Sequence, residues 1–246
     1  MKRAFDIFAS LAGLIFFSPI LFVFMFLIWW QDYHSPFYIA KRMGLNGREF
    51  DMVKLRSMIK NADKNGVDST SSNDKRITKV GHLIRKFKLD ELMQLWNVLI
   101  GDMSLVGPRP NVMRETDLYT NVEKKLLTVK PGITDISSIV FSDEGDILYG
   151  KDDPDISYHQ LIRPGKSKLG LFYILHRNFL LDLYLVFLTL LAIISKPKAL
   201  NLLTSKMKKL DASKELITIA SRTQELIPSP PPGAKNIVTS RDGAVR

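Results

Sequence analysis

The sequence predicts a mostly helical α/β protein that is monotopic, which means that it attaches to one face of a membrane. Three observations lead to this fold class. The chain begins with a long apolar run interrupted by a Ser-Pro pair, it contains one strong β-hairpin signal, and most later apolar residues recur at helical spacing. We therefore expect a re-entrant N-terminal helix, a small β-hairpin and amphipathic helices at the membrane interface.

Composition indicates the size of the core and the kind of partner. The chain has 246 residues, 46% of them hydrophobic, which is enough for one domain with appendages. It contains no cysteine, which excludes disulfides, thiolate metal sites and a cysteine nucleophile. Lysine and arginine number 35 against 25 for aspartate and glutamate, and the net charge of +10 favours nucleic acid, anionic lipid headgroups or phosphorylated substrates.

The N-terminal segment favours lipid among these partners. Residues Ile7–Trp30 are 24 residues without a charge, and a helix of that length could cross the hydrocarbon core of a bilayer. A cleaved signal peptide is not expected, because its apolar region would be shorter and no cleavage site of small residues follows Trp30. A single-pass anchor is the simplest remaining interpretation, but two features argue against it.

The first feature is the pair Ser18-Pro19 near the middle of the run. Pro19 has no N–H to donate to the carbonyl of Ile15, and its ring crowds that carbonyl, so the helix should bend there. Ser18 can donate a local hydrogen bond and help to satisfy the freed carbonyl.

The second feature is the positive charge on both flanks of the run, carried by Lys2, Arg3, Lys41, Arg42, Arg48, Lys54 and Arg56. The positive-inside rule keeps both flanks in the cytoplasm. Residues 1–33 are therefore predicted to form a re-entrant hairpin that dips into one leaflet and returns. Its aromatic end, Trp29, Trp30 and Tyr33, would lie at the level of the lipid headgroups.

After this segment the sequence predicts a β-hairpin over residues 37–58, because Asn46-Gly47 is a typical hairpin turn. Lys54 and Arg56 are two residues apart on its second strand, so both should face one side. Residues 60–78 are rich in Asn, Asp, Ser and Lys and predict a surface loop.

Helices and a rigid loop follow. One helix is expected over Asp90–Ile100, ended by Gly101 and with Trp96 on its buried side. Gly107-Pro108-Arg109-Pro110 predicts a rigid loop, since proline restricts itself and the residue before it. Residues 112–129 are predicted to be helical and polar, and residues 133–165 to be mixed, with short strands.

The last part of the chain becomes apolar again before it turns polar. Phe179–Ile194 has 16 residues, which is short for a span, so a helix along the membrane interface is expected. The predicted organisation is a folded domain over 34–200 and a basic, Pro-rich tail over 201–246 with a polyproline linker. That tail is expected to be disordered or to pack on a second copy, so a homodimer is left open.

Asp90 and Glu91 open the predicted helix, and two interpretations stand side by side. Acids at the start of a helix cap it and complement its dipole, which is a structural role. The same helix end also attracts phosphate. A carboxylate there can act as a nucleophile toward phosphorus or as a ligand of Mg²⁺, with Glu91 as a second ligand or a base.

Several cations could complete such a site. Arg109, held between two prolines, is suited to bidentate phosphate binding, although it could also be an exposed arginine in a turn. Lys54 and Arg56 could bind phosphate from one strand face or be solvated there. Neither of the common Gly-rich phosphate motifs is present, so a nucleotide would be bound by other means.

Residues Lys88–Pro110, which include Asp90-Glu91 and Gly107-Pro108-Arg109-Pro110, resemble the signature block of the bacterial sugar transferase family, the monotopic phosphoglycosyl transferases. Supporting matches lie on both sides, at Lys2–Asp6 with Ser18-Pro19, Arg42–Phe50, Lys54–Met58, Lys130–Thr134 and Asp182–Ile194. The resemblance covers about residues 2–200.

This resemblance implies an enzyme of the bacterial inner membrane whose catalytic domain, 34–200, works on the cytoplasmic face. It would use Mg²⁺ to transfer a sugar-1-phosphate from a UDP-sugar to polyprenyl phosphate, releasing UMP, as the first membrane step of polysaccharide or glycoconjugate synthesis. Asp90 would form a phosphosugar–aspartyl intermediate, and Glu91 would help to bind the metal or deprotonate the acceptor. Phosphate or substrate would be bound by Arg42, Lys54, Arg56 and Arg109.

Two other functions are alternatives. A catalytically silent membrane scaffold of a glycan assembly complex would keep the fold without the chemistry, but the intact Asp90, Glu91 and Arg109 argue against it. A membrane-anchored nucleic-acid-binding protein would need a basic patch with interleaved aromatic residues. The positive charge is instead spread along the chain, so no nucleic-acid partner is expected.

Overall fold

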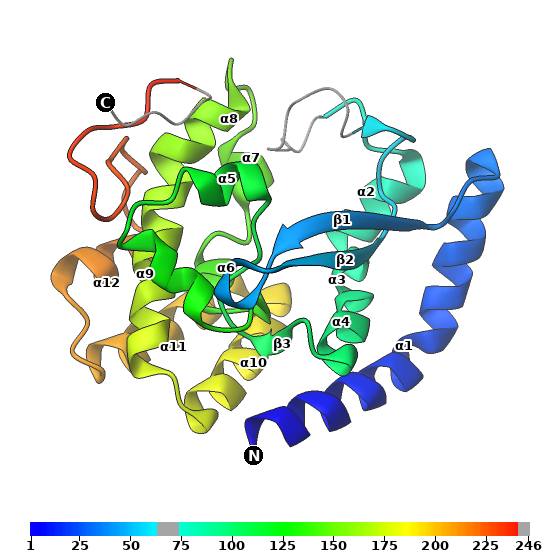
Figure 1. The fold of residues 1–246 in the computed structure, drawn as a ribbon, viewed down its shortest axis with the longest axis horizontal. Helices are drawn as coiled ribbons and strands as arrows, with labels where there is room; N and C mark the ends of the chain where they lie inside the picture. Colours follow the sequence, from blue (N-terminus) through cyan, green and yellow to red (C-terminus); the bar gives the residue numbers. More distant parts are fainter. Residues whose placement is uncertain (63–73, 241–246) are drawn as a thin grey trace.

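The computed structural model describes residues 1–62 and 74–240, so most of the predicted surface loop at 60–78 lies outside the described residues. The protein is mostly helical with two small sheets, as the sequence predicts (Figure 1). Its first elements are α1 (Lys2–Asp32), β1 (Phe37–Met43), η1 (Leu45–Gly47), β2 (Glu49–Leu55), α2 (Lys79–Lys86), α3 (Leu89–Leu92), α4 (Gln94–Ile100), β3 (Ser104–Val106), α5 (Met113–Asp117) and η3 (Glu123–Thr128). The later elements are β4 (Gly132–Thr134), α6 (Ile136–Val140), α7 (Glu144–Ile147), α8 (Pro154–Ser157), the π-helix η4 (Tyr158–Ile162), α9 (Arg163–His176), α10 (Phe179–Ile194), α11 (Lys196–Lys208) and α12 (Lys214–Ser221).

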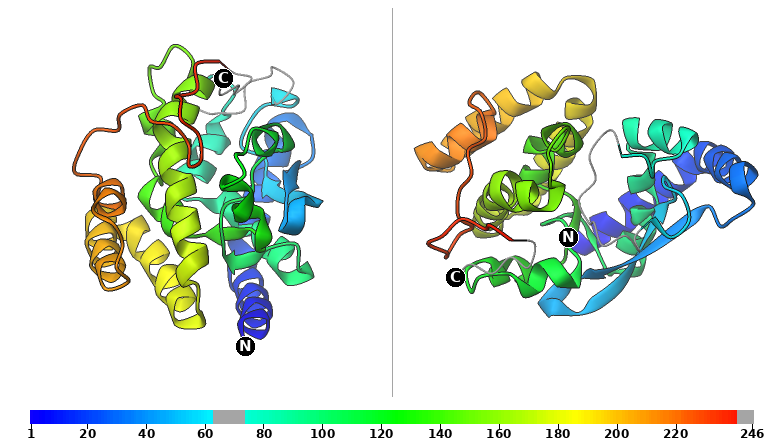
Figure 2. Two further views of the ribbon diagram at one scale, coloured as in Figure 1. Left: turned by 60° about the vertical axis from the view of Figure 1, so that its left-hand side comes forward. Right: turned by 90° about the horizontal axis from the view of Figure 1, so that it is seen from above.

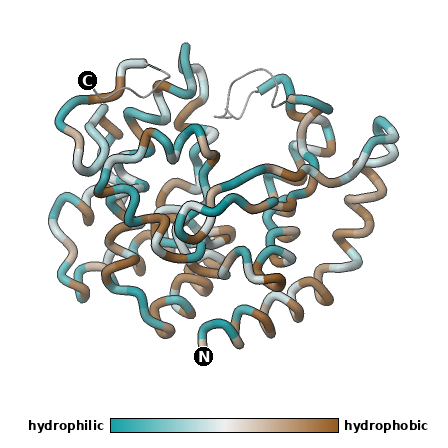
Figure 3. Tube along the Cα trace, viewed as in Figure 1, coloured by the Kyte–Doolittle hydropathy of each residue, from teal (hydrophilic) through white to brown (hydrophobic). Residues whose placement is uncertain are grey.

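Helix α1 is one continuous helix that bends near its middle and runs along one side of the molecule (Figure 1). Pro19 lies inside it, and the Ser18 hydroxyl donates to the carbonyl of Ile15 at 2.7 Å, so the bend and its local hydrogen bond are confirmed. Within the described ranges α1 alone is long and apolar enough to span a membrane. It exposes large apolar residues, including Phe8, Ile15, Phe16, Phe22, Val23, Phe26 and Trp30. Most of its trace is hydrophobic (Figure 3).

The N-terminal end of α1 is attached to the rest of the fold by polar side chains. Lys2 pairs with Asp182 of α10 at 2.6 Å, and Arg3 donates to the carbonyls of Val98 and Leu99 at 2.5 and 2.8 Å near the end of α4. The buried Asp6 accepts hydrogen bonds from the Ser104 hydroxyl and the Leu105 N–H of β3. This end of the apolar helix is therefore fixed to α4 and β3, which lie within the signature block, and to α10.

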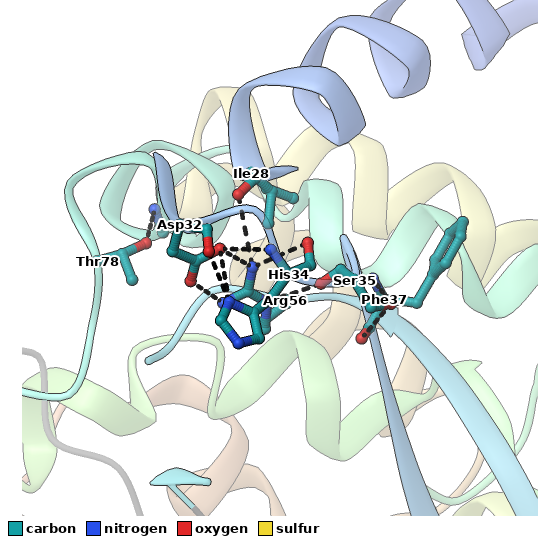
Figure 4. A network of polar contacts seen from close by, with 8 residues as sticks. Ile28, Asp32, His34, Ser35, Phe37, Arg56 and Thr78 are labelled. Atoms are coloured by element: carbon teal, nitrogen blue, oxygen red, sulfur yellow. Dashed lines mark hydrogen bonds and ion pairs between the residues drawn. The ribbon is translucent and has the colours of Figure 1, made fainter. Parts of the chain in front are cut away.

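The other end of α1 is held by Arg56 (Figure 4). Its guanidinium forms a two-pronged pair with Asp32 at 2.5 and 2.7 Å and also donates to the Ser35 carbonyl at 2.8 Å. Arg56 is 7% exposed, so this pair is largely shielded from water. Both ends of α1 thus bind the same folded domain.

The β-hairpin forms as predicted. Strands β1 and β2 pair antiparallel from Phe37 opposite Leu55 to Met43 opposite Glu49. The turn takes left-handed backbone at Asn46 (φ 55°) and Gly47 (φ 71°), which suits Asn-Gly. Asn97 of α4 accepts from the Val53 N–H at 2.9 Å and donates to the Asp51 carbonyl at 2.7 Å, which ties the hairpin to the helix that follows Asp90.

The main core lies among α6, α9, α10, α11 and α12, whose helices are seen from two further sides in Figure 2. Leu169, Leu185 and Leu203 are fully buried in it. A second cluster joins α1 to α2, α3 and the end of β2, and a third lies between the hairpin and α4. Helix α10 packs one side against the main core and exposes Leu180, Phe187, Leu190, Ile193 and Ile194 on its surface.

Two sequence predictions about local structure are right only in part, and one is wrong. Residues 133–165 are mainly helical rather than stranded, because Asp135 and Asp153 cap the starts of α6 and α8 and only β4 remains as a strand. The segment 112–129 divides into α5 and η3, between which Thr120 and Glu123 form reciprocal capping hydrogen bonds. Trp96 is 47% exposed rather than buried.

The segment 201–240 is not the disordered tail that the sequence predicts. The boundary at 200/201 falls inside α11, whose Leu203 and Met207 are buried in the main core. The Pro-rich stretch packs on its own chain: Thr120 donates to the Pro232 carbonyl, and Gln160 donates to the Val238 carbonyl at 2.7 Å. The buried side chains of α11 and these two hydrogen bonds hold the segment against the domain, so it is not a free linker.

We expect Arg56→Met to lower the free energy of unfolding by about 2 kcal/mol. Removing one partner of a buried pair usually costs roughly 3–5 kcal/mol, and the partial exposure of Asp32 reduces that value. Thermal unfolding in lipid nanodiscs measures the change. The matched control is Lys41→Met, which removes an exposed pair with Asp51 and should leave stability unchanged. Equal effects of the two substitutions would contradict the role given to Arg56.

Candidate active site

Asp90 and Glu91 lie in a short helical turn that the chain reaches through a strained residue. Lys88 adopts left-handed backbone (φ 56°) between α2 and α3, and α3 extends only from Leu89 to Leu92. The predicted helix over 90–100 thus consists of α3 and α4, with Met93 between them in nearly helical backbone (φ −68°, ψ −19°). No side chain caps α3, so capping does not account for the acidic pair.

Each acid faces a cation that comes from a different element. Lys54 Nζ of β2 lies 3.9 Å from Asp90 Oδ2. Arg109 Nη2, from the loop after β3, donates to Glu91 Oε1 at 3.0 Å. All four side chains are largely shielded but not fully buried, with 16–30% exposure, so a substrate can reach them.

The loop that carries Arg109 is fixed by a close backbone contact. Strand β3 pairs parallel with β4, the Gly107 N–H donates to the Thr134 carbonyl, and the Gly132 N–H donates to the Pro108 carbonyl, each at 3.0 Å. A Cβ at Gly132 would lie 2.0 Å from the Gly107 nitrogen, so only glycine permits this approach. Pro108 and Pro110 then restrict the backbone around Arg109.

The charges of the site shift one another's pKa values. Burial raises the pKa of Glu91, but Arg109, Lys88 and Lys54 outweigh it, and the net pKa lies below the usual value. Glu91 in turn raises the pKa of Arg109. Burial, helped by the nearby Arg109, lowers the pKa of Lys54 to about 8 although Asp90 and Glu91 oppose that shift.

The structure brings together most of the predicted site residues, but not all. Asp90, Glu91, Lys54 and Arg109 meet as described, and Arg42 of β1 is close enough to contribute to the lowered pKa of Lys54. Arg56 does not join them. It follows β2 and turns to Asp32, so the prediction that Lys54 and Arg56 share one phosphate-binding face is not met by the geometry.

Four further charged residues belong to this neighbourhood and were missed as site residues. Lys88 and Arg85 lie beside the acidic pair. Lys88 lowers the pKa of Glu91. Burial lowers the pKa of Arg85, and the charge of Asp90 acts in the opposite direction. Glu144 pairs with Lys166, and both Lys166 and Arg109 lower its pKa against burial. The basic run at 85–88 was a usable signal, whereas Glu144 and Lys166 come together only through the tertiary fold.

A small cavity opens beside Arg109. The residues that line it include Asp135, Ser137, Lys166, Ser167 and Gly170. Asp135 is fully buried and accepts hydrogen bonds from Ser137 and Ser138, and burial raises its pKa. This cavity adjoins the acidic pair through Arg109 and could receive part of a substrate.

The carboxylates of Asp90 and Glu91 are the candidate ligands for a divalent metal ion. In the described ranges, 1–62 and 74–240, no three His, Cys, Asp or Glu side chains cluster closely enough to hold a metal alone. Mg²⁺ commonly binds through one or two carboxylates together with substrate phosphates and water. The donor set therefore suits a metal that arrives with a phosphorylated substrate.

An apolar helix attached to a partly shielded site of paired acids and cations defines a membrane-associated enzyme whose site is suited to phosphate groups. The chain belongs to the bacterial sugar transferase family, whose model matches residues 1–196. It is therefore a sugar transferase, as the motif at Lys88–Pro110 predicts.

Similar proteins carry related names. The exopolysaccharide production protein ExoY of Sinorhizobium fredii is 33% identical over 207 residues, which are 78% of this chain and 84% of that protein. The UDP-N-acetylgalactosamine-undecaprenyl-phosphate N-acetylgalactosaminephosphotransferase of Aeromonas hydrophila is 32% identical over 79% of this chain and 44% of its own. The undecaprenyl-phosphate galactose phosphotransferase of Salmonella typhimurium is 38% identical over 61% of this chain and 34% of its own. This chain thus matches less than half the length of the last two.

Because the pKa of Lys54 is about 8, we expect its positive charge, and with it the rate of sugar transfer, to fall as pH rises through 8. The protonated, active form lies below that pH. Lys54→Arg should move this alkaline limb upward by more than one pH unit, since a guanidinium stays charged. A pH–rate profile measures it, with the exposed Lys41→Arg as a control that keeps the wild-type profile. An unchanged alkaline limb in Lys54→Arg would contradict the assignment.

Proposed function

We propose that this enzyme transfers a sugar-1-phosphate from a UDP-sugar to a polyprenyl phosphate, such as undecaprenyl phosphate, and releases UMP. The observation that carries the proposal is the pair Asp90-Glu91, held between Lys54 and Arg109 on a domain fastened to an apolar helix. The names of the similar proteins from Aeromonas hydrophila and Salmonella typhimurium support the same reaction class. Exopolysaccharide production, in the name of the Sinorhizobium fredii protein, supports a role in polysaccharide synthesis.

The reaction proceeds in two displacements at one phosphorus. In the first, a carboxylate oxygen of Asp90 attacks the sugar-bearing phosphorus. The bond from that phosphorus to the bridging oxygen breaks, and UMP leaves with the electron pair. In the second, a phosphate oxygen of polyprenyl phosphate attacks the same phosphorus and displaces Asp90, which regains its carboxylate. The product is polyprenyl-diphospho-sugar, and no proton is required overall.

The surrounding charges give each neighbour a role. Lys54 and Arg109 stabilise the negative charge on the phosphoryl oxygens during each displacement, and they act strongly because the site is partly shielded from water. Glu91 has a lowered pKa and accepts a hydrogen bond from Arg109. Both features make its carboxylate a weak base, so the role of metal ligand suits Glu91 better than that of proton acceptor. Mg²⁺, held by Asp90 and Glu91, would neutralise charge on the diphosphate of the donor.

The enzyme's attachment to the membrane explains how a lipid phosphate reaches this site. We propose that α1 enters one leaflet, bends at Ser18-Pro19 and returns, so that the site lies on the cytoplasmic face of the inner membrane. Both ends of α1 bind the same domain, through Lys2 and Asp6 at one end and Asp32 at the other, which favours a helix that does not cross. The exposed apolar residues of α10 would lie in the same interface.

Asp90→Asn tests the chemistry, because an amide cannot replace the carboxylate as nucleophile. Wild-type protein in nanodiscs is exposed briefly to a panel of UDP-sugars without lipid acceptor, digested, and analysed by mass spectrometry. We expect a phosphosugar adduct on the peptide that contains Asp90, and loss of the adduct with a fall in UMP release of about a thousand-fold in Asp90→Asn. Asp117→Asn, on the exposed side of α5, is the matched control and should keep both signals. An adduct on another residue would contradict the assignment, and no adduct with any donor would favour a silent scaffold.

The absence of cysteine makes the topology directly testable. Single cysteines at Ala4, Phe16 and Lys60 are labelled from outside and inside in spheroplasts with a membrane-impermeant maleimide. We expect Ala4→Cys and Lys60→Cys to react only from the cytoplasmic side and Phe16→Cys to be protected from both, since Phe16 is exposed on the apolar side of α1. Reaction of positions 4 and 60 from opposite sides would show a helix that crosses.

A further inference from the structure

Gln94, the first residue of α4, is buried without a protein partner. Its side chain has no exposed surface, and neither the oxygen nor the nitrogen of its amide forms a hydrogen bond within the described part of the chain. Buried amides are nearly always hydrogen-bonded, and an apolar side chain of the same shape would avoid leaving two polar atoms unmatched. The sequence keeps an amide there, four residues after Asp90.

The position of Gln94 follows from the helical geometry. Met93 has nearly helical backbone (φ −68°, ψ −19°), so α3 and α4 continue one another and Asp90, Gln94 and Asn97 lie along one side. Both ends of this row face β2. Asn97 bonds Val53 and Asp51, and Asp90 faces Lys54. The spacing therefore puts Gln94 on the side of α3 and α4 that faces β2, one helical turn after Asp90.

We propose that Gln94 is a positioning residue for Asp90. In the reacting state its amide nitrogen donates to one carboxylate oxygen of Asp90 and directs the other oxygen toward the phosphorus, while its amide oxygen accepts from Lys54 Nζ. Gln and Asp side chains four residues apart on a helix can form this hydrogen bond. The assignment rests on the proposed function, because it assumes that Asp90 attacks the donor.

A positioning role and a purely structural role predict different effects of the same substitution on turnover and on stability. A purely structural glutamine, for example one that holds a buried water, would lose stability when replaced by methionine and would leave the turnover of the folded enzyme unchanged. A positioning glutamine behaves in the opposite way: methionine fills the same space without unmatched polar atoms, so folding is kept, but the carboxylate loses its orientation.

Gln94→Met in nanodiscs tests the inference, with Leu95→Met as the matched control that places the same side chain next along the same helix. Thermal unfolding, the donor KM and the rate of UMP release are measured for wild type and both variants. We expect Gln94→Met to melt at or above the wild-type temperature, with the rate lowered tenfold to a hundredfold and the donor KM within twofold. Leu95→Met should match wild type in rate and KM.

Each other outcome is informative. A Gln94→Met enzyme within threefold of the wild-type rate, or one whose loss lies entirely in KM, overturns the inference. If Gln94→Met does not fold, Gln94→Glu decides, because it keeps the shape and removes the N–H donor: a folded variant with the wild-type rate overturns the inference, and one with a tenfold loss supports it. Wild-type protein that releases no UMP contradicts the proposed function instead, so the two failures are distinguishable.

Discussion

The structure depends on holding two adjacent carboxylates beside two cations that come from different parts of the chain. Asp90 faces Lys54 of β2, and Glu91 binds Arg109 of the loop after β3. Neighbouring acids in a partly shielded site would repel each other and pick up protons without such partners. The hairpin, α3 and the Arg109 loop must therefore be placed together, and the Asn97 bonds to β2 and the close approach of Gly107 to Gly132 do so.

The same elements connect the site to the apolar helix α1. Arg3 binds the carbonyls at the end of α4, Asp6 binds β3, and Asp32 binds Arg56 just after β2. Each of these contacts lies within a few residues of an element that supplies a site residue. Because both ends of α1 bind them, the proposed insertion of α1 into one leaflet would also set the height of the acidic pair above the membrane surface. The proposed reaction joins a soluble nucleotide-sugar to a lipid phosphate, and a fixed height would bring both to the same site.

Local signals in the sequence predicted much of this arrangement. The bend at Ser18-Pro19, the hairpin with its Asn-Gly turn, and the meeting of Asp90, Glu91, Lys54 and Arg109 were all available from motifs or from the family resemblance. Arg56 was assigned wrongly to the phosphate-binding face because alternation along a strand predicts one face only while the strand continues, and β2 ends at Leu55. The Glu144–Lys166 pair and the burial of Gln94 could not be predicted, because long-range packing and not sequence spacing produces them. The Pro-rich segment was misjudged for the same reason, since composition does not reveal that Thr120 and Gln160 donate hydrogen bonds to its carbonyls at Pro232 and Val238.

The central claim is that the sugar phosphate passes through the carboxylate of Asp90 before any lipid is involved. Isotope exchange tests this most directly: radiolabelled UMP is incubated with an unlabelled UDP-sugar and the enzyme in nanodiscs that contain no polyprenyl phosphate. A two-displacement enzyme reverses its first step and moves the label into the UDP-sugar. If label enters only after polyprenyl phosphate is added, both substrates must be bound together, and the covalent account is wrong.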